Sequence, residues 1–265
     1  MNIVVLCGGT STERDISLIS SEGICKALNT KRHKAILLDV FLGDDTLDTE
    51  HLFSQEQYDV DAVLADIRKR SEQLEQIKAQ RKEFFGPNVM EACRKADVVF
   101  LGLHGANGED GKVQAVLDLL GIAYTGADYL SSAMAMSKSL TKQIFQATHV
   151  PMAKGITFQP LSVYEMSYPC VVKPSCGGSS VGVFYANDEK EYKEALEQAF
   201  AYEDELVVEE CVKGREFSVG IIGTEALPVI EIIPKAGTYD YKNKYTPGAT
   251  DEICPANVTE ELKNK

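Results

Sequence analysis

The chain has 265 residues, of which 44% are hydrophobic and 25% charged, and its formal net charge is -13. This composition is typical of a soluble globular protein and allows one large domain or two to three small ones. The acidic excess argues against nonspecific nucleic-acid binding, and no apolar run approaches the ~20 residues that cross a membrane. The N-terminus enters a strand without a basic leader, which predicts no signal peptide.

The seven cysteines are irregularly spaced, and no two of them form a CxxC pair. Most lie in apolar runs, so we expect reduced, buried thiols in a cytoplasmic protein. Cys176 lies among glycine and serine residues and is the exposed candidate, although no histidine near it in the sequence would activate its thiol.

The first part of the chain has the pattern of a doubly wound α/β domain. The apolar run Asn2–Cys7 ends at two glycines and predicts a buried strand, and apolar residues at helical spacing follow it as far as Leu28. Lys34–Val40 alternates as a second strand, Asp97–Leu103 is a third buried run, and Ile122–Thr125 predicts the last strand. Strand, glycine-rich turn and helix in this order begin a parallel α/β unit.

The segment between the second and third strands is charged. Phe41–Tyr58 is polar and acidic and predicts a loop. Asp59–Phe85 predicts one long helix with a thin apolar stripe, which either packs one edge on the domain or extends a dimer contact. Gly86-Pro87 ends this helix, and Val89–Ala96 predicts a short one.

Polar groups follow two of the predicted strands. Open α/β sheets bind ligands beyond the carboxyl ends of their strands, and Glu13 and His104 both occupy such positions. His104 is compatible with a ligand contact or with an ordinary hydrogen-bonded loop histidine. The turn GGTSTE lacks the G-x-G-x-x-G fingerprint, so a Rossmann-type oxidoreductase is not favoured.

The first domain ends at a proline in this prediction. Helical patterns run to His149 and stop at Val150-Pro151, which is a suitable boundary. A strand at Gly155–Phe158 begins the next part, and a linker with Pro160 and Pro169 follows it.

A loop of serine and glycine residues, Pro174–Ser180, separates two predicted strands, Cys170–Val172 and Val181–Tyr185. Its glycines let several backbone N–H groups converge on one anion, and its serine hydroxyls add donors. Lys173 adds a positive charge at the rim. The loop is compatible with a flap over nucleotide phosphates or with an ordinary hairpin.

The remainder predicts a small α+β lobe and a polar loop. Asp188–Ala201 is an amphipathic helix, and Leu206–Val212 is a strand. Arg215–Ile222 and Ala226–Pro234 are expected to pair as antiparallel strands. Ala236–Ile253 is too polar for a strand and long for a turn, so we expect a functional loop there.

Charged side chains from separate segments suit a nucleotide. Glu209, Glu210 and Glu216 lie near strand ends, where carboxylates can accept hydrogen bonds from an adenine amino group and from ribose hydroxyls. Lys138 and Lys173 suit the phosphates. The pattern indicates a nucleotide between two lobes, with a small cationic or zwitterionic substrate facing it.

Six motifs occur in order along the chain: GGTSTERDISLIS, LHGANGEDGKVQ, GIAYTGADYLSSAMAMSK, VVKPSCGGSSVGV, VEECVKGREFSV and YDYKNKYTPGATDEICPA. In order and spacing they resemble those of the D-alanine–D-alanine ligases of the ATP-grasp superfamily. The match covers nearly the whole chain except about residues 41–96.

The resemblance implies a fold of class α/β and α+β. Residues 1–127 would form the N-terminal doubly wound α/β domain, residues 128–223 the central ATP-grasp lobe, and residues 224–265 the incomplete start of the C-terminal ATP-grasp lobe. It implies ATP-dependent ligation of two D-alanines through an acyl phosphate, for peptidoglycan precursor synthesis and hence the cell wall and cell shape. It further implies a cytoplasmic homodimer with no nucleic-acid or membrane partner.

The resemblance also implies residue roles. Glu13 would hold the ammonium of the first D-alanine, His104 would line its pocket, and Lys244 would reach a carboxylate or the γ-phosphate. Ser179 and Tyr245 would form a hydrogen-bonded catalytic set with Glu13. The residues expected to bind ATP are Lys138, Lys173, Ser179, Ser180, Glu209, Glu210, Val212 (through its backbone N–H) and Glu216.

The same resemblance places the ligands of Mg²⁺ beyond residue 265, so we expect no metal ligand in this chain. Without metal the phosphate charge is not neutralised, and we expect almost no phosphate release until the chain is extended. Glu210 and Cys211 also depart from the adenine hinge of some relatives. The alternatives are a D-alanine–D-serine or D-alanine–D-lactate ligase, or a noncatalytic nucleotide-binding remnant.

Overall fold

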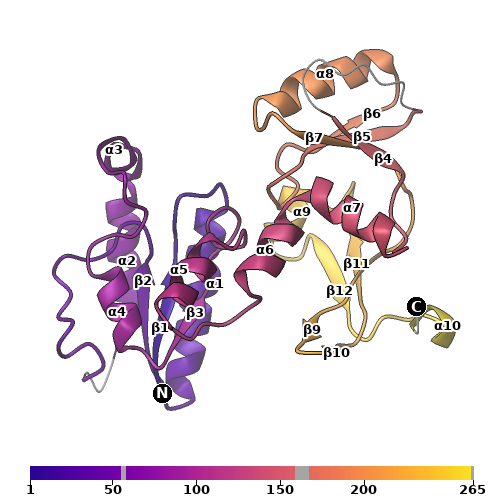
Figure 1. The fold of residues 1–265 in the computed structure, drawn as a ribbon. Coiled ribbons are helices and arrows are strands. Elements are labelled where there is room, and N and C mark those ends of the chain that lie inside the picture. The colour runs from indigo at the N-terminus through magenta and orange to yellow at the C-terminus, as the bar shows by residue number, and fades with distance from the viewer. Residues whose placement is uncertain (55–57, 159–166, 264–265) are drawn as a thin grey trace. The chain divides into compact units, whose positions relative to one another are not determined.

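The computed structural model describes residues 1–54, 58–158 and 167–263, so Pro160 of the predicted linker lies outside the described residues. The chain divides into two compact units, Met1–Thr141 and Lys142–Lys265 (Figure 1). The division falls inside helix α7 (Lys138–Ala147), upstream of the predicted boundary at Val150-Pro151. The reason is that the second half of α7 makes its contacts with the later unit, as described below for Lys142.

The first unit contains a parallel sheet with the strand order β2-β1-β3. The strands are β1 (Asn2–Cys7), β2 (Lys34–Asp39) and β3 (Val98–Leu101). Every residue of β1 after Asn2 is buried, so both faces of the sheet are covered, as in doubly wound folds. Ligand sites of such sheets lie beyond the carboxyl ends of the strands.

The helices of the first unit connect and cover these strands (Figure 1). Helix α1 packs against β1 and β2, and α4 packs against β1. The helices are α1 (Arg14–Thr30), α2 (Val60–Ser71), α3 (Leu74–Gln80), α4 (Val89–Lys95), α5 (Lys112–Leu119) and α6 (Tyr129–Met136).

Two predictions for this unit were wrong in detail. The single helix predicted over Asp59–Phe85 is two helices, α2 and α3. Ser71 at the end of α2 donates its hydroxyl proton to the carbonyl of Ile67 at 2.8 Å, a local bond that competes with helix continuation. The predicted strand Ile122–Thr125 contributes only one isolated bridge, to β3. Glycines with positive φ lie at both of its ends and turn the chain away.

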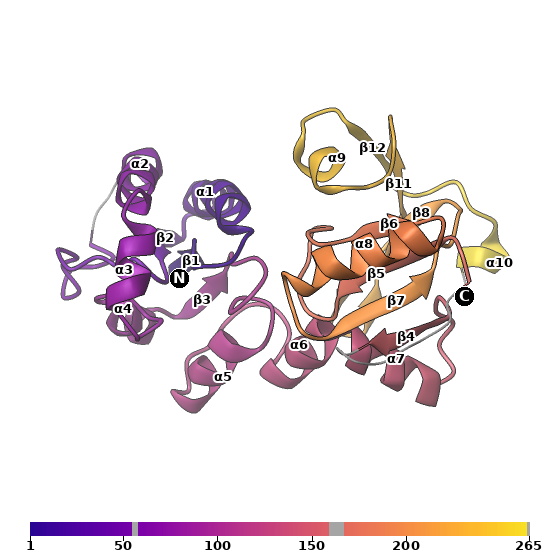
Figure 2. The ribbon, with the colours of Figure 1, turned by 90° about the horizontal axis from the view of Figure 1, so that it is seen from above.

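The second unit begins with a four-stranded antiparallel sheet of order β4-β7-β5-β6. Its strands are β4 (Gly155–Phe158), β5 (Cys170–Pro174), β6 (Phe184–Ala186) and β7 (Leu206–Glu210). Helix α8 (Glu189–Phe200) lies across β5 and β6 (Figure 2). Its buried face, which includes Tyr192, Ala195 and Ala199, forms the core of this unit with apolar residues of the strands.

A second antiparallel sheet in this unit has the order β12-β11-β8. Its strands are β8 (Glu216–Ser218), β11 (Ile230–Pro234) and β12 (Thr250–Ile253), and a short hairpin joins β9 (Ile221–Ile222) to β10 (Glu225–Ala226). Two short helices, α9 (Tyr241–Tyr245) and α10 (Glu260–Lys263), complete the described elements. No helix within the described ranges is long and apolar enough to cross a membrane.

The polar loop predicted over Ala236–Ile253 contains α9 and β12, so this prediction was wrong in part. The carboxylate of Asp240 accepts a hydrogen bond from the backbone N–H of Asn243 at 2.8 Å and caps α9. Strand β12 pairs with β11, and its residues Asp251 and Glu252 are exposed, which explains their polar character.

The burial of the cysteines follows the prediction for five of the seven: four are buried and Cys176 is exposed, as expected, whereas Cys211 and Cys254 are not buried. Burial raises the pKa of Cys25 and of Cys93 to about 12 and that of Cys7 well above its ordinary value. Cys170 is also buried, Cys211 is half-buried, and Cys176 and Cys254 are exposed.

Candidate functional site

The Ser/Gly loop between β5 and β6 has an unusual backbone. Ser179 and Ser180 have φ angles of 52° and 62°, in the left-handed region that costs a non-glycine residue roughly 1–3 kcal/mol. Gly182 also has a positive φ, so the turn continues through it, and β6 begins at Phe184 instead of the predicted Val181. Such local strain is typical of ligand-binding segments.

This loop, residues 175–182, is called the flap below. At its start, the backbone N–H of fully buried Ser175 donates to the carbonyl of Glu205 at 2.9 Å. The backbone N–H of Cys176 donates to the carboxylate of Glu203 at 2.7 Å. The flap is therefore anchored to the turn that follows α8.

The tip of the flap contacts the segment that contains α9. The hydroxyl oxygens of Ser179 and Tyr245 are 2.5 Å apart, and the hydroxyl of Ser180 donates to the backbone carbonyl of Tyr239 at 3.2 Å. The ammonium of Lys244 lies 5.0 Å from the centre of the Tyr239 ring, a cation–π contact. The structure thus brings four of the predicted site residues into one cluster.

A second cluster is centred on Glu209 of β7, whose side chain is only 14% exposed. One carboxylate oxygen is 2.8 Å from the ammonium of Lys142 on α7, and the other forms an ion pair with Lys173 on the neighbouring strand β5. Burial alone would raise the pKa of the Glu209 carboxyl, but the hydrogen bonds from the two lysines outweigh it and hold the pKa below its ordinary value.

Two ammonium groups on one carboxylate leave the cluster with a net positive charge, which suits a phosphate group. Lys142 was missed by the sequence reasoning. The signal was its position four residues after Lys138, which places both lysines on the same face of a helix. Lys142 also donates to the carbonyl of Ala153 at 2.7 Å, so its ammonium is held in place.

Glu210, the next predicted residue, connects the end of β7 to Lys154, the residue before β4. Its carboxylate accepts a hydrogen bond from the backbone N–H of Lys154 at 2.8 Å, and its own N–H donates to the carbonyl of Lys154 at 2.8 Å. Glu210 thereby fixes the chain at the point where β7 passes into the next segment.

That next segment, with β11, lines a pocket of about 640 Å³, within the range of small-molecule sites. Val212 and Glu216, both predicted to contact the nucleotide, lie in its wall. Arg215 also lines it and holds Glu231 of β11 through two bonds of 2.6 and 2.7 Å. The hydrogen bond from Arg215 lowers the pKa of the Glu231 carboxyl.

The first unit contains a separate polar site where the segments that follow β1 and β3 meet. Glu13 is 4% exposed, and a Cβ added to Gly105 would lie 2.7 Å from its carboxylate oxygen Oε2. The Ser11 hydroxyl accepts from the N–H of Glu13 at 3.2 Å and donates to the carbonyl of His104 at 2.7 Å. Ring nitrogen Nε2 of His104 is 3.0 Å from the hydroxyl of Ser20. The segments that carry Glu13 and His104 are therefore joined through Ser11.

Lys138, the remaining predicted residue, begins α7 and belongs to the first unit with Glu13 and His104. The flap, the Glu209 cluster and the pocket all belong to the second unit. Across the parts of the chain that the structure describes, no group of three or more His, Cys, Asp or Glu side chains could hold a metal ion.

Comparison with family models gives two matches that together span almost the whole chain. The model described as the D-ala D-ala ligase N-terminus matches residues 2–127, and that described as the D-ala D-ala ligase C-terminus matches residues 143–265. The second match contains the flap, the pocket, and Glu209 and Lys173 of the Glu209 cluster, and it begins one residue after Lys142.

Comparisons with individual proteins agree with the family matches. The D-alanine–D-alanine ligase of Pediococcus pentosaceus is 38% identical over 276 residues, which cover 100% of this chain and 78% of that protein. That of Halalkalibacterium halodurans is 35% identical over 271 residues, covering 98% and 75%.

Solved structures give the same result. The crystal structure of D-alanine–D-alanine ligase from Bacillus anthracis matches with a TM-score of 0.69 at 27% identity, covering 100% of this chain and 74% of that one. The VanG D-Ala:D-Ser ligase from Enterococcus faecalis matches with a TM-score of 0.67 at 26% identity, covering 99% and 78%.

An α/β unit followed by two antiparallel sheets, with a Ser/Gly flap and paired lysines, defines an ATP-grasp ligase. Within that class the chain belongs to the D-alanine–D-alanine ligase family. The resemblance, the fold class and the enzyme class expected from the sequence are thereby confirmed.

Proposed function

We propose that this chain binds ATP and two D-alanines and takes part in their ligation to D-alanyl-D-alanine. The observation that carries the proposal is the 2.5 Å contact between Ser179 and Tyr245, which joins a strained flap to the segment bearing Lys244. The names of the relatives support the choice of substrate. D-alanyl-D-alanine would serve peptidoglycan precursor synthesis in the cytoplasm, and we expect a homodimer.

The nucleotide would bind to the second unit. Its phosphates would lie under the flap, next to the positively charged cluster of Lys142, Lys173 and Glu209. Its base and ribose would occupy the 640 Å³ pocket beside Val212 and Glu216. Hydroxyls, backbone N–H groups and ammonium groups are the donors that phosphate oxygens require, so these residues fit ATP.

The first D-alanine would bind in the first unit. The buried carboxylate of Glu13 would accept hydrogen bonds from its ammonium group, and His104 would line the same pocket. The substrate carboxylate would attack the γ-phosphoryl group and become an acyl phosphate. The amine of the second D-alanine would then attack the acyl carbon, and inorganic phosphate would leave.

In this account the chain's own residues position the substrates and neutralise the charge of the phosphates. Lys138 and Lys173 would neutralise phosphate charge, Lys244 would reach the substrate carboxylate or the γ-phosphate, and Glu210 would fix the hinge beside the base. Family resemblance implies Mg²⁺, for which the described residues offer no cluster of three or more His, Cys, Asp or Glu side chains.

The three-part division into residues 1–127, 128–223 and 224–265 remains part of the proposal. The ends of the two family matches, at residues 127 and 143, support its first boundary.

A thermal-shift titration tests the proposed function. We expect ATP to raise the melting temperature of the chain, and D-alanine added to the ATP-bound chain to raise it further, with L-alanine as the control. A shift with ATP and none with D-alanine would favour a noncatalytic nucleotide-binding module. The same titration with D-serine and D-lactate separates the ligases that differ in their second substrate.

A further inference from the structure

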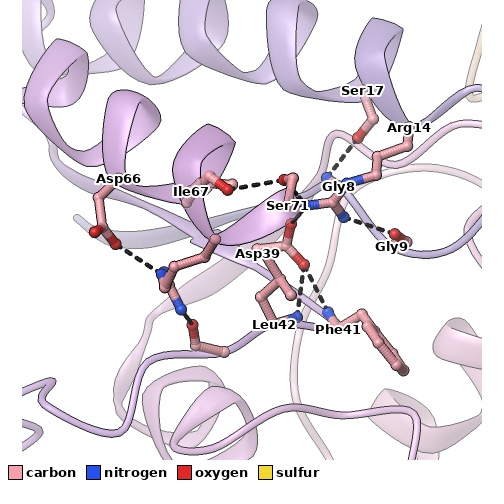
Figure 3. Close-up of polar contacts among 12 residues, drawn as sticks. Gly8, Gly9, Arg14, Ser17, Asp39, Phe41, Leu42, Asp66, Ile67 and Ser71 are labelled. Carbon is pink, nitrogen blue, oxygen red and sulfur yellow. Dashed lines mark hydrogen bonds and ion pairs between the residues drawn. The ribbon is translucent and has the colours of Figure 1, made fainter. Parts of the chain in front are cut away.

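Arg14, the residue that follows Glu13 in the sequence, forms a buried ion pair with Asp39 that takes no part in the function proposed above (Figure 3). Guanidinium nitrogen Nη2 of Arg14 is 2.6 Å from carboxylate oxygen Oδ2 of Asp39. Arg14 is 7% exposed and Asp39 is fully buried. Removing two charged groups from water is costly, so such a pair requires further contacts to be retained.

The other contacts of Asp39 make it a rigid acceptor. It is the last residue of β2, and its oxygen Oδ1 accepts hydrogen bonds from the backbone N–H groups of Phe41 and Leu42 at 2.9 and 2.8 Å. The carboxylate therefore cannot turn without breaking the start of the next segment. Figure 3 shows these bonds converging on Asp39 from the side opposite Arg14.

Arg14 uses its other nitrogen to hold the turn that contains Glu13. Its Nη1 donates to the carbonyl of Gly9 at 2.6 Å, which ties the two ends of the segment 9–14 together. Gly8 leaves the space for this arrangement, because a Cβ there would lie 2.0 Å from Asp39 Oδ2 and 2.6 Å from Arg14 Nη1. The turn is thus built around the ion pair.

The same guanidinium group reaches the charged segment that lies outside the six motifs. Its Nη2 donates to the hydroxyl of Ser71 at 2.8 Å, and that hydroxyl donates to the carbonyl of Ile67 in α2. The end of α2 is therefore connected to the turn that carries Glu13.

We propose that Arg14, Asp39 and Ser71 are positioning residues. They orient the carboxylate of Glu13 so that it can bind the ammonium group of D-alanine. The inference rests on the proposed function of Glu13 and assigns a role to the link with α2. Because burying two charges costs desolvation, the pair is weak evidence for added stability, and its contacts with the turn favour a positioning role. A lysine at position 14 can keep the pair with Asp39, but it lacks the planar fork that also binds Gly9 and Ser71.

Calorimetric titration of the chain saturated with a nonhydrolysable ATP analogue tests the inference. We expect Arg14→Lys to weaken D-alanine binding by about tenfold, equivalent to ~1.4 kcal/mol, with the affinity for the analogue unchanged. Ser71→Ala, which removes one hydrogen bond and no charge, is expected to weaken D-alanine binding by roughly threefold. Arg94→Lys, at an exposed position of the same unit, is the matched control.

Each outcome of the titration either supports or overturns the inference. Unchanged D-alanine affinity in Arg14→Lys and Ser71→Ala would overturn the inference and leave the proposed function intact. Equal losses of D-alanine and analogue affinity would show a merely structural role and would also overturn it. A wild-type chain that binds the analogue but no D-alanine would refute the proposed role of Glu13 together with this inference.

Discussion

The hydroxyl groups of Ser179 and Tyr245 form a hydrogen bond of 2.5 Å, although 66 residues separate them in the sequence. The bond joins the flap to α9 within the second unit. Since Ser180 bonds to Tyr239 in the same segment, the flap is held against α9 at two adjacent residues. Opening of the flap would have to break both contacts.

Replacement of Tyr245 by phenylalanine removes one of the two contacts between the flap and the segment that contains α9. A typical hydrogen bond contributes about 1 kcal/mol, so we expect nucleotide affinity to fall roughly fivefold and amide hydrogen exchange in the flap to accelerate. Tyr241→Phe is the control, because Tyr241 packs its ring on that of Tyr245 and is itself exposed. Equal exchange rates in wild type and Tyr245→Phe would count against a closed flap.

Lys142 provides a second prediction. Its replacement by methionine keeps the aliphatic stem but removes one of the two ammonium groups at Glu209, so the cluster loses its net positive charge. We expect ATP affinity to fall about tenfold, with a smaller effect on adenosine, which has no phosphate. Lys190→Met, on the exposed surface of α8, is the matched control. An equal loss of adenosine affinity would refute the role of Lys142 in phosphate binding.

The stability of the second unit should depend on pH through Glu209. The lysines hold its folded pKa below the ordinary value of 4.5, so its stabilising effect is complete above pH 4.5 and is lost as the pH falls through the lowered folded pKa. We expect Glu209→Gln to lose roughly 2 kcal/mol of unfolding free energy at neutral pH.

Urea denaturation of wild type and Glu209→Gln between pH 7 and pH 3 measures this effect. The difference between the two proteins should shrink below pH 4.5. A difference that stays constant over the whole range would mean that the ion pairs do not determine the pKa of Glu209.

Two glycines allow a matched comparison in the first unit. Gly8 has a φ of +72°, and an added Cβ would clash with Asp39, so Gly8→Ala should cost more than about 1 kcal/mol of stability. Gly23 lies within α1, where a Cβ would meet nothing within 4 Å, and Gly23→Ala should gain up to ~1 kcal/mol. Thermal unfolding of both variants checks the prediction, and the opposite order of stabilities would contradict it.

The sequence predicted best those features that depend on local pattern. The strands at Asn2–Cys7 and Gly155–Phe158 have the predicted bounds, because apolar residues and flanking glycine or proline residues mark them. The position of Glu13 beyond β1 follows from the same pattern. The exposed strand β12 was missed, because its pairing with β11 is not encoded in its own apolar content.

Contacts between distant segments could not be derived from local pattern, and the Ser179–Tyr245 bond was expected only through the family resemblance. Nothing near Lys142 indicates that it meets Glu209, since 67 residues separate them. The Arg14–Asp39 pair was missed for the same reason, although Arg14 begins α1 and Asp39 ends β2. Such pairs depend on the register of strands, which only the folded chain defines.

The central claim is that a nucleotide binds under the flap of the second unit with its phosphates beside Lys173. A crystal structure of the chain with bound ADP tests it most directly. We predict the diphosphate within hydrogen-bonding distance of the flap residues Ser179 and Ser180, and the base in the pocket lined by Val212. ADP bound at another place, with the flap and that pocket empty, would contradict the account.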